Sequence, residues 1–154
     1  MQTLPMLSSQ EIRNFLKKTI FSQLDTKLVD KLLPLIERFK VTSGEVIRKI
    51  GDESGSLILV ESGKFSASDA DHSVLATYGE GECIGPLSVL FGGTQLLKTQ
   101  ATEESIIIVL DAGSLKMLEF SEPHLMLQIF RCIRLYAGPK FHAAEQLMLQ
   151  LYQS

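Results

Sequence analysis

The chain has few of the features that mark secreted, metal-binding or membrane proteins. Its two cysteines, Cys83 and Cys132, lie far apart and outside any metal-ligand spacing, which favours two reduced, buried thiols over a disulfide framework. No apolar run approaches the ~18–20 residues that span a bilayer. The N-terminus lacks a charged start followed by an apolar core. We therefore expect no direct membrane insertion, no signal peptide and a cytoplasmic location.

An excess of positive charge is also missing. The chain carries 15 Lys and Arg residues against 18 Asp and Glu residues, so its net charge is −3 and its pI is near 5.6. Proteins that bind nucleic acids usually present a basic surface. The composition therefore argues against a nucleic-acid partner.

The usual patterns of catalytic and metal-binding residues are absent. The three histidines, His72, His124 and His142, are scattered and share no ligand spacing. Ser88 lies in the segment Gly-Pro-Leu-Ser-Val, which is not a nucleophile motif. We expect a protein that is not an enzyme and holds no metal. A cupin-like metal enzyme is the alternative from another functional class.

Helical patterns occupy both ends of the chain. Apolar stripes and capping residues predict helices over Ser9–Ile20 and Thr26–Phe39, with a kink or break near Leu33 because Pro34 follows it. Toward the C-terminus, the chain returns to a helical pattern over Gly113–Leu118, and a helix from Ser121 to about Leu135 follows. Gly138-Pro139 should interrupt it before a last helix from about Lys140 to Tyr152.

The middle of the chain has the pattern of short strands separated by turn residues. The candidate strands are Val46-Ile47, Leu57–Val60, Phe65–Ala67, Val74–Tyr78, Ile84, Gln100–Thr102 and Ile106–Leu110, and Asp69–His72 has the composition of a hairpin tip. Short strands without helices between them favour a closed or double-sheet antiparallel fold. We predict one domain over residues 1–154, mainly β: N-terminal helices over 1–39, an antiparallel β jelly roll over 40–111 and C-terminal helices over 112–154.

An ordered series of glycines carries a family resemblance. Gly44 and Gly51-Asp52 mark turns, Glu61–Phe65 has the form x-x-G-x-F, and Tyr78–Gly85 reads YGEGECIG. Together with Phe21–Leu24 (FSQL), this order resembles the cyclic nucleotide-binding domain, a small β jelly roll that serves as a ligand-gated regulatory module. The resemblance covers roughly Phe21 to Leu135.

The resemblance implies a phosphate-binding cassette after Gly85, and the sequence departs from it at two positions. The family has a glutamate for the ribose 2′-hydroxyl after Gly85, whereas this chain has Pro86. Thr99 falls where the family has an arginine for the phosphate. The candidate ligand-binding residues of this degenerate cassette are Gly85, Leu87, Ser88, Lys98, Thr99, Gln100, Ala101 and Thr102.

These departures favour a regulatory or interaction module that does not bind cAMP or cGMP with the usual affinity. The alternative is a genuine sensor of a cyclic nucleotide or another small ligand, in which Lys98 and Thr99 replace the arginine. Apolar residues of the C-terminal helices either pack on the barrel or form a homodimer or partner-domain interface. The sequence is also compatible with a fragment of a larger protein, such as a transporter or channel.

Overall fold

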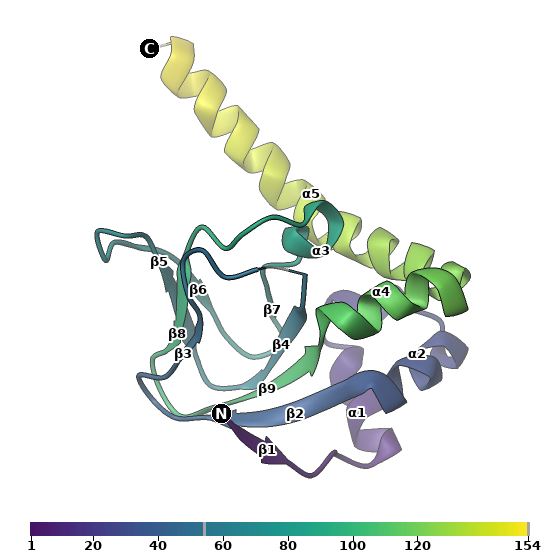
Figure 1. Ribbon diagram of the computed structural model, residues 1–154. Coiled ribbons are helices and arrows are strands. Elements are labelled where there is room, and N and C mark those ends of the chain that lie inside the picture. The colour runs from purple at the N-terminus through teal and green to yellow at the C-terminus, as the bar shows by residue number, and fades with distance from the viewer. Residues whose placement is uncertain (54, 154) are drawn as a thin grey trace.

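The computed structural model describes residues 1–53 and 55–153, and two antiparallel sheets form its centre (Figure 1). The first sheet has the strand order β1-β2-β9-β4-β7, with β1 at Gln2–Leu4, β2 at Ile36–Val41, β9 at Ser105–Leu110, β4 at Leu57–Ser62 and β7 at Cys83–Ile84. The second has the order β3-β8-β5-β6, with β3 at Val46–Arg48, β8 at Lys98–Ala101, β5 at Phe65–Ser68 and β6 at Val74–Tyr78. The predicted antiparallel jelly roll with flanking helices is confirmed.

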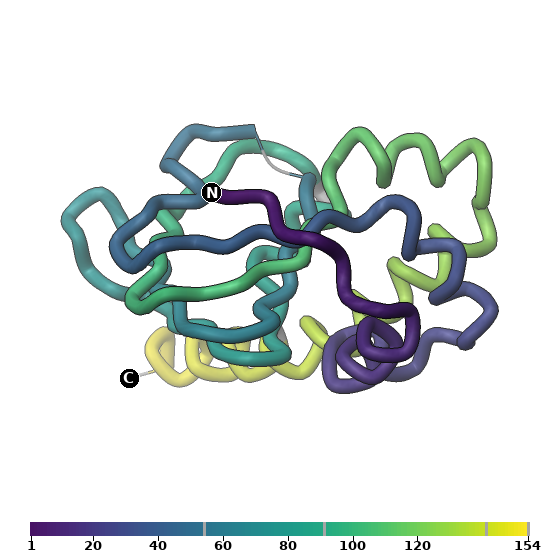
Figure 2. Tube along the Cα trace, turned by 90° about the horizontal axis from the view of Figure 1, so that it is seen from below, coloured from purple at the N-terminus to yellow at the C-terminus, as the bar shows by residue number. Residues whose placement is uncertain are grey.

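Helices gather at one end of this barrel, as both ribbon and trace show (Figures 1 and 2). They are α1 (Ser9–Leu16), α2 (Thr26–Leu32), α4 (Ala112–Ser121) and α5 (Pro123–Gln153), with 3₁₀ turns at Ile20–Gln23 and Leu33–Leu35. A short helix, α3 (Leu87–Phe91), lies between β7 and β8. The C-terminal half of α5 projects away from the barrel (Figure 1).

Strand β4 separates two apolar cores because both of its faces are covered. Leu57 and Leu59 pack with the helices, whereas Ile58 and Val60 pack inside the barrel around Phe65. Successive side chains of a strand point to opposite faces, so a strand buried on both sides is apolar throughout. The run Leu57–Val60 therefore lies between the helical layer and the barrel interior and contributes side chains to both cores.

Several predicted boundaries are confirmed. Ser8 caps α1 in a capping box with Glu11, and the second helix ends at Leu32 before a 3₁₀ turn that contains Pro34, close to the predicted break. The hairpin tip at Asp69–His72 joins β5 to β6, where the Asp69 carboxylate accepts from the N–H groups of Asp71 and Ser73.

Other boundaries were wrong. The N-terminal helical region ends at Leu35 and not at Phe39, because Ile36–Val41 pairs with β9 along its whole length. Ser121 ends α4 instead of starting the next helix, which begins at Pro123, and its hydroxyl donates to the carbonyl of Met117. Helix α5 continues through Pro139; Leu135, whose carbonyl loses its helical N–H donor at the proline, is an exposed residue.

Candidate ligand site

A buried arginine, Arg48, lies at the end of β3 in the barrel. Arg48 ends β3, opposite Thr99 of β8, after a register irregularity between Val46 and Arg48. Its side chain is 6% exposed. The guanidinium donates to the carbonyl of Ser56 at 2.6 Å and to the carbonyl of Ile84 at 3.4 Å. The arginine thus links β3 to the strand that leads into the cassette segment.

No carboxylate balances this charge in the described part of the chain. The ion pairs found there involve Arg13, Arg38, Lys31, Lys40 and the N-terminal amine, and none involves Arg48. Burial lowers the pKa of Arg48, since desolvation penalises the charged form. An arginine nevertheless stays protonated near neutral pH. The barrel therefore holds a positive charge whose hydrogen bonds, among the described residues, go to two backbone carbonyls.

The cassette turn at Gly85 is shaped around this guanidinium. Gly85 has φ of 62°, and a Cβ atom there would lie 2.3 Å from Nη1 of Arg48. Pro86 precedes α3 as its N-cap residue without a side-chain capping bond, and the Ser88 hydroxyl donates to the carbonyl of Gly85 at 2.8 Å. A side chain at position 85 would push the Arg48 guanidinium aside, and the positive φ of the turn itself favours glycine.

A cavity of about 390 Å³ opens beside Arg48. Its polar residues come from several separate segments of the chain, and burial raises the pKa of one of them, Tyr78, so that this phenol stays neutral. The lining consists of Arg48, Ala67, Tyr78, Ile84, Gly85, Leu87, Ser88, Gly92, Thr94, Gln95, Leu96, Leu97 and Thr99. A small molecule with an apolar body and one polar end matches such a wall.

Four of the residues singled out from the sequence line this cavity: Gly85, Leu87, Ser88 and Thr99. The remaining four, Lys98, Gln100, Ala101 and Thr102, do not.

The alternation of β8 explains this division. Thr99 and Ala101 are buried, while Lys98 and Gln100 are only half-buried on the other face, where the Gln100 amide donates to the carbonyl of Gly44. Ala101 packs in the barrel core, and Thr102 follows the strand and donates to the carbonyl of Lys64.

Sequence reasoning missed Arg48 and Gln95. Arg48 lies in a strand that was predicted only as Val46-Ile47, and a charged side chain inside an apolar barrel has no periodic signature. Gln95 lies in the irregular segment between α3 and β8, where its N–H donates to Asp52 and its carbonyl accepts from Gly51, both at 2.8 Å. The cue available was the Gly51-Asp52 turn, but its partner segment is fixed only by the tertiary structure.

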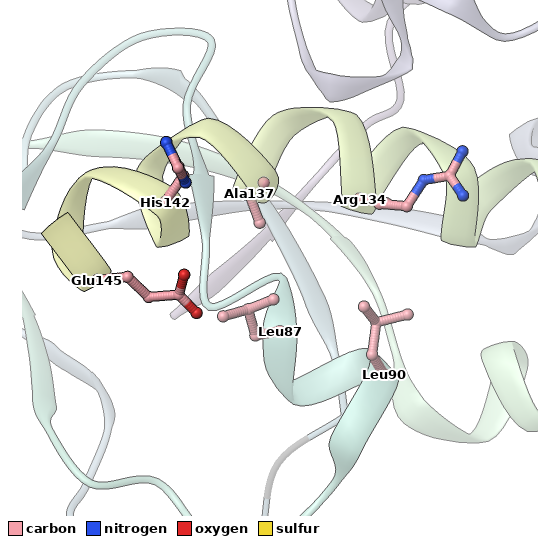
Figure 3. A pocket seen from close by; sticks show the side chains of 7 residues that line it. Leu87, Leu90, Arg134, Ala137, His142 and Glu145 are labelled. Atoms are coloured by element: carbon pink, nitrogen blue, oxygen red, sulfur yellow. The ribbon is translucent and has the colours of Figure 1, made fainter.

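Helix α5 contacts the cassette from outside the barrel. The N–H of Cys83 donates to the phenol oxygen of Tyr136 at 3.4 Å, and the Lys140 ammonium lies 4.0 Å from the centre of the Tyr136 ring. A second cavity, of about 350 Å³, lies between α3 and α5. Leu87 and Leu90 face Ala137 across it, and Arg134, His142 and Glu145 surround it (Figure 3).

Residues 1–53 and 55–153 contain neither a cluster of metal ligands nor a membrane-spanning helix. No group of three or more His, Cys, Asp or Glu side chains there is arranged to hold a metal ion. No helix of this part is long and apolar enough to cross a bilayer. Both cysteines are free and buried, as the sequence predicts.

Curated relatives are similar to this chain over part of their length. An uncharacterized NTE family protein of Mycobacterium bovis is 25% identical over 88 residues, which make up 57% of this chain and 15% of that protein. A cAMP-dependent protein kinase regulatory subunit of Eremothecium gossypii is 28% identical over 95 residues, 62% of this chain and 20% of that protein. The chain thus spans a fifth or less of each of these relatives.

Solved structures and a family model agree on the fold. The crystal structure of a cyclic nucleotide-binding domain from Methylobacillus flagellatus superposes with a TM-score of 0.74 at 19% identity, covering 94% of this chain and 85% of that one. The family model described as "Cyclic nucleotide-binding domain" matches residues 38–120, more than half of the 154 residues. This chain therefore belongs to the cyclic nucleotide-binding domain family.

Proposed function

We propose that this chain is a non-enzymatic regulatory or interaction module whose barrel does not bind cAMP or cGMP with the affinity usual in its family. The observation that carries the proposal is Pro86, which follows Gly85 at the start of α3 where the resemblance calls for a glutamate. Proline has no carboxylate to accept from a ribose 2′-hydroxyl and no N–H to donate to an anion.

Thr99 supports the same conclusion. It is 4% exposed and lines the cavity, at the place that the resemblance gives to the phosphate-binding arginine. A hydroxyl offers one donor and no charge, whereas an arginine offers a bidentate, charge-assisted contact. The loss of that contact costs roughly 1.5–3 kcal/mol, or about 10–150-fold in affinity. Together with Pro86, it moves cyclic-nucleotide binding from the micromolar toward the millimolar range.

Lys98 is a poor substitute for the missing arginine. It lies on the face of β8 opposite to Thr99 and is not among the residues that line the cavity. A lysine would also act as a point charge without the planar fork that an arginine presents to a phosphate. The geometry thus favours a module that takes a different small ligand, or none, over a cyclic-nucleotide sensor built on Lys98 and Thr99.

The C-terminal half of α5 is the candidate output surface. Its exposed apolar side chains include Leu147, Met148, Leu151 and Tyr152, on a segment that extends beyond the barrel (Figure 1). Such a patch is typical of a homodimer or partner-domain interface. Sedimentation of the wild-type chain and of Leu147→Lys/Leu151→Lys over a range of concentrations tests this: mass that rises with concentration only in the wild type supports it, and two identical monomers contradict it.

Calorimetric titration with cAMP and cGMP up to millimolar concentration tests the cassette. We expect no saturable micromolar binding to the wild-type chain, and tighter binding to Pro86→Glu, which restores the 2′-hydroxyl acceptor. Saturable micromolar binding that is lost in Lys98→Ala would replace the proposal with the sensor hypothesis.

A further inference from the structure

Two buried polar side chains line the barrel cavity without the ion-pair or hydrogen-bond partners that buried polar groups normally have. Arg48 is 6% exposed and forms no ion pair among the described residues. The side-chain nitrogen of Gln95, Nε2, is buried and has no hydrogen-bond partner there either. Both residues line the same cavity of about 390 Å³. Buried charges are normally paired and buried amides normally bonded, so each of these groups calls for an explanation.

Hydrogen bonds of the chain position both residues at the cavity. The Arg48 guanidinium is held by two backbone carbonyls, those of Ser56 and Ile84. The backbone of Gln95 is fixed by two hydrogen bonds of 2.8 Å to the Gly51-Asp52 turn, which follows the Arg48 strand, and this places its buried Nε2 atom at the cavity. Donors that are positioned before a ligand arrives lose little entropy when it binds.

The donor inventory defines what would satisfy this pair. A guanidinium has five N–H donors, and two contacts to protein carbonyls are present. The Gln95 Nε2 atom supplies further N–H donors. Neither group can accept a hydrogen bond, so the matching partner is an acceptor that also carries negative charge. Lys98 lies outside the lining, which leaves one positively charged side chain for the cavity and therefore favours a ligand with a single anionic group.

We propose that Arg48 and Gln95 form an anion site that binds the carboxylate or phosphate group of a small organic anion, while Ala67, Ile84, Leu87 and Leu97 receive its apolar body. This inference rests on the proposed function, in which the barrel takes a small ligand other than a cyclic nucleotide. The cation comes from β3, the strand paired with β8 of the cassette, and replaces both the missing cassette arginine and Lys98 in that role.

A purely structural role for Arg48 makes a different prediction. If the arginine only bridges Ser56 and Ile84, its loss unfolds the barrel and the Gln95 amide has no influence on binding. Gln95→Leu separates the two cases, because it removes an unpartnered buried amide from a side chain of similar size. This variant should fold at least as well as the wild type, since no hydrogen bond of the Nε2 atom is lost.

The experiment measures dissociation constants of the full chain for benzoate, phenyl phosphate and the uncharged benzyl alcohol by NMR titration at constant ionic strength. The two anions separate a carboxylate ligand from a phosphate ligand on the same ring. We expect at least one anion to bind about tenfold or more tightly than benzyl alcohol, the range of one charge-assisted hydrogen bond. The Nε–H signal of Arg48 and the side-chain NH₂ signals of Gln95 should shift on binding.

The variants give the decisive comparison. Gln95→Leu and Arg48→Gln should each lose the preference for the anion, and Lys98→Ala, the matched loss of a nearby cation outside the cavity, should retain it. Equal binding of charged and uncharged probes, no binding of either anion, or unchanged anion binding by Gln95→Leu would each overturn the anion site. Micromolar cAMP binding that requires Arg48 would overturn the proposed function but leave the anion site standing. Weak cAMP binding together with no preferential binding of either anion would overturn the anion site but leave the proposed function standing.

Discussion

The backbone N–H of Cys83 donates to the phenol oxygen of Tyr136 at 3.4 Å, which joins the strand before the cassette to the helix that leaves the barrel. Cys83 lies in β7 and precedes Gly85 by two positions, while Tyr136 stands one turn before the projecting part of α5. The contact therefore ties the backbone two residues before Gly85 directly to α5.

Replacement of Tyr136 by phenylalanine removes the acceptor and leaves the ring in place. We expect Tyr136→Phe to lower the free energy of unfolding by about 0.5–1.5 kcal/mol, the range of one hydrogen bond. Urea denaturation measures the effect. Tyr152→Phe is the control, because Tyr152 is 91% exposed and its hydroxyl should contribute nothing measurable. Equal stability of both variants would show that the contact does not stabilise the fold.

Gly63 should tolerate no side chain. A Cβ atom there would lie 2.0 Å from Oγ and 2.7 Å from Cα of Ser105, and its φ is 95°. The matched control is Gly44, which has φ of 87° but no atom within 4 Å of the added Cβ. We expect Gly44→Ala to cost about 1–2 kcal/mol from backbone strain alone and Gly63→Ala to cost about 1–3 kcal/mol more from the clash. Thermal unfolding of both variants tests the difference, and equal melting temperatures would contradict it.

Stability should fall at alkaline pH because of Cys83. Burial raises the pKa of its thiol from 9.0 to about 12. The unfolded state therefore releases this proton first, so the contribution is complete below pH 9 and is lost as the pH rises toward 12. For one group the slope reaches roughly 1.4 kcal/mol per pH unit. Urea denaturation between pH 8 and 10.5 should show a shallower decline for Cys83→Ala than for the wild type; parallel declines would assign the alkaline loss to other groups.

The end of α5 should be dispensable for folding. Residues 146–153 are all exposed, so truncation after Glu145 should change the free energy of unfolding by less than about 0.5 kcal/mol. Truncation after Gln128 is the contrasting variant, because it removes Ile129, Cys132 and Ile133 from the helical core and should abolish cooperative unfolding. A large loss of stability in the shorter truncation would mean that the projecting segment packs against the barrel.

The elements with local signals could be predicted from the sequence. Ser8 and Glu11 form the capping box at one helix start, Pro34 lies in the 3₁₀ turn that ends the next helical segment, and the glycine turns punctuate the strands in the expected order. The errors fall where tertiary structure overrides local preference. Ile36–Val41 reads as helix until it pairs with β9, and Pro139 does not break a helix whose neighbouring turn faces water.

The candidate site could be predicted only in part. Gly85, Leu87, Ser88 and Thr99 follow from the order of the cassette segment, which is continuous in sequence. Arg48 and Gln95 are 47 positions apart and meet because β3 pairs with β8 and because Gln95 bonds to the turn after β3. Arg48 lies outside the cassette segment, and Gln95 lies within it but at none of the positions that the resemblance marks. Strand pairing over such separations leaves no periodic trace in a single sequence.

Because α5 is continuous through Pro139, a small tilt at its barrel end would move its C-terminal tip by a larger distance. From Tyr136 to Tyr152 an α-helix rises about 24 Å at 1.5 Å per residue. A tilt of about 10° at the Tyr136 contact would therefore sweep the tip through roughly 4 Å, even where the barrel itself shifts by only a fraction of an ångström. An interruption at Gly138-Pro139 would have absorbed such a tilt in a flexible joint. The unbroken helix would instead carry the tilt to its C-terminal end.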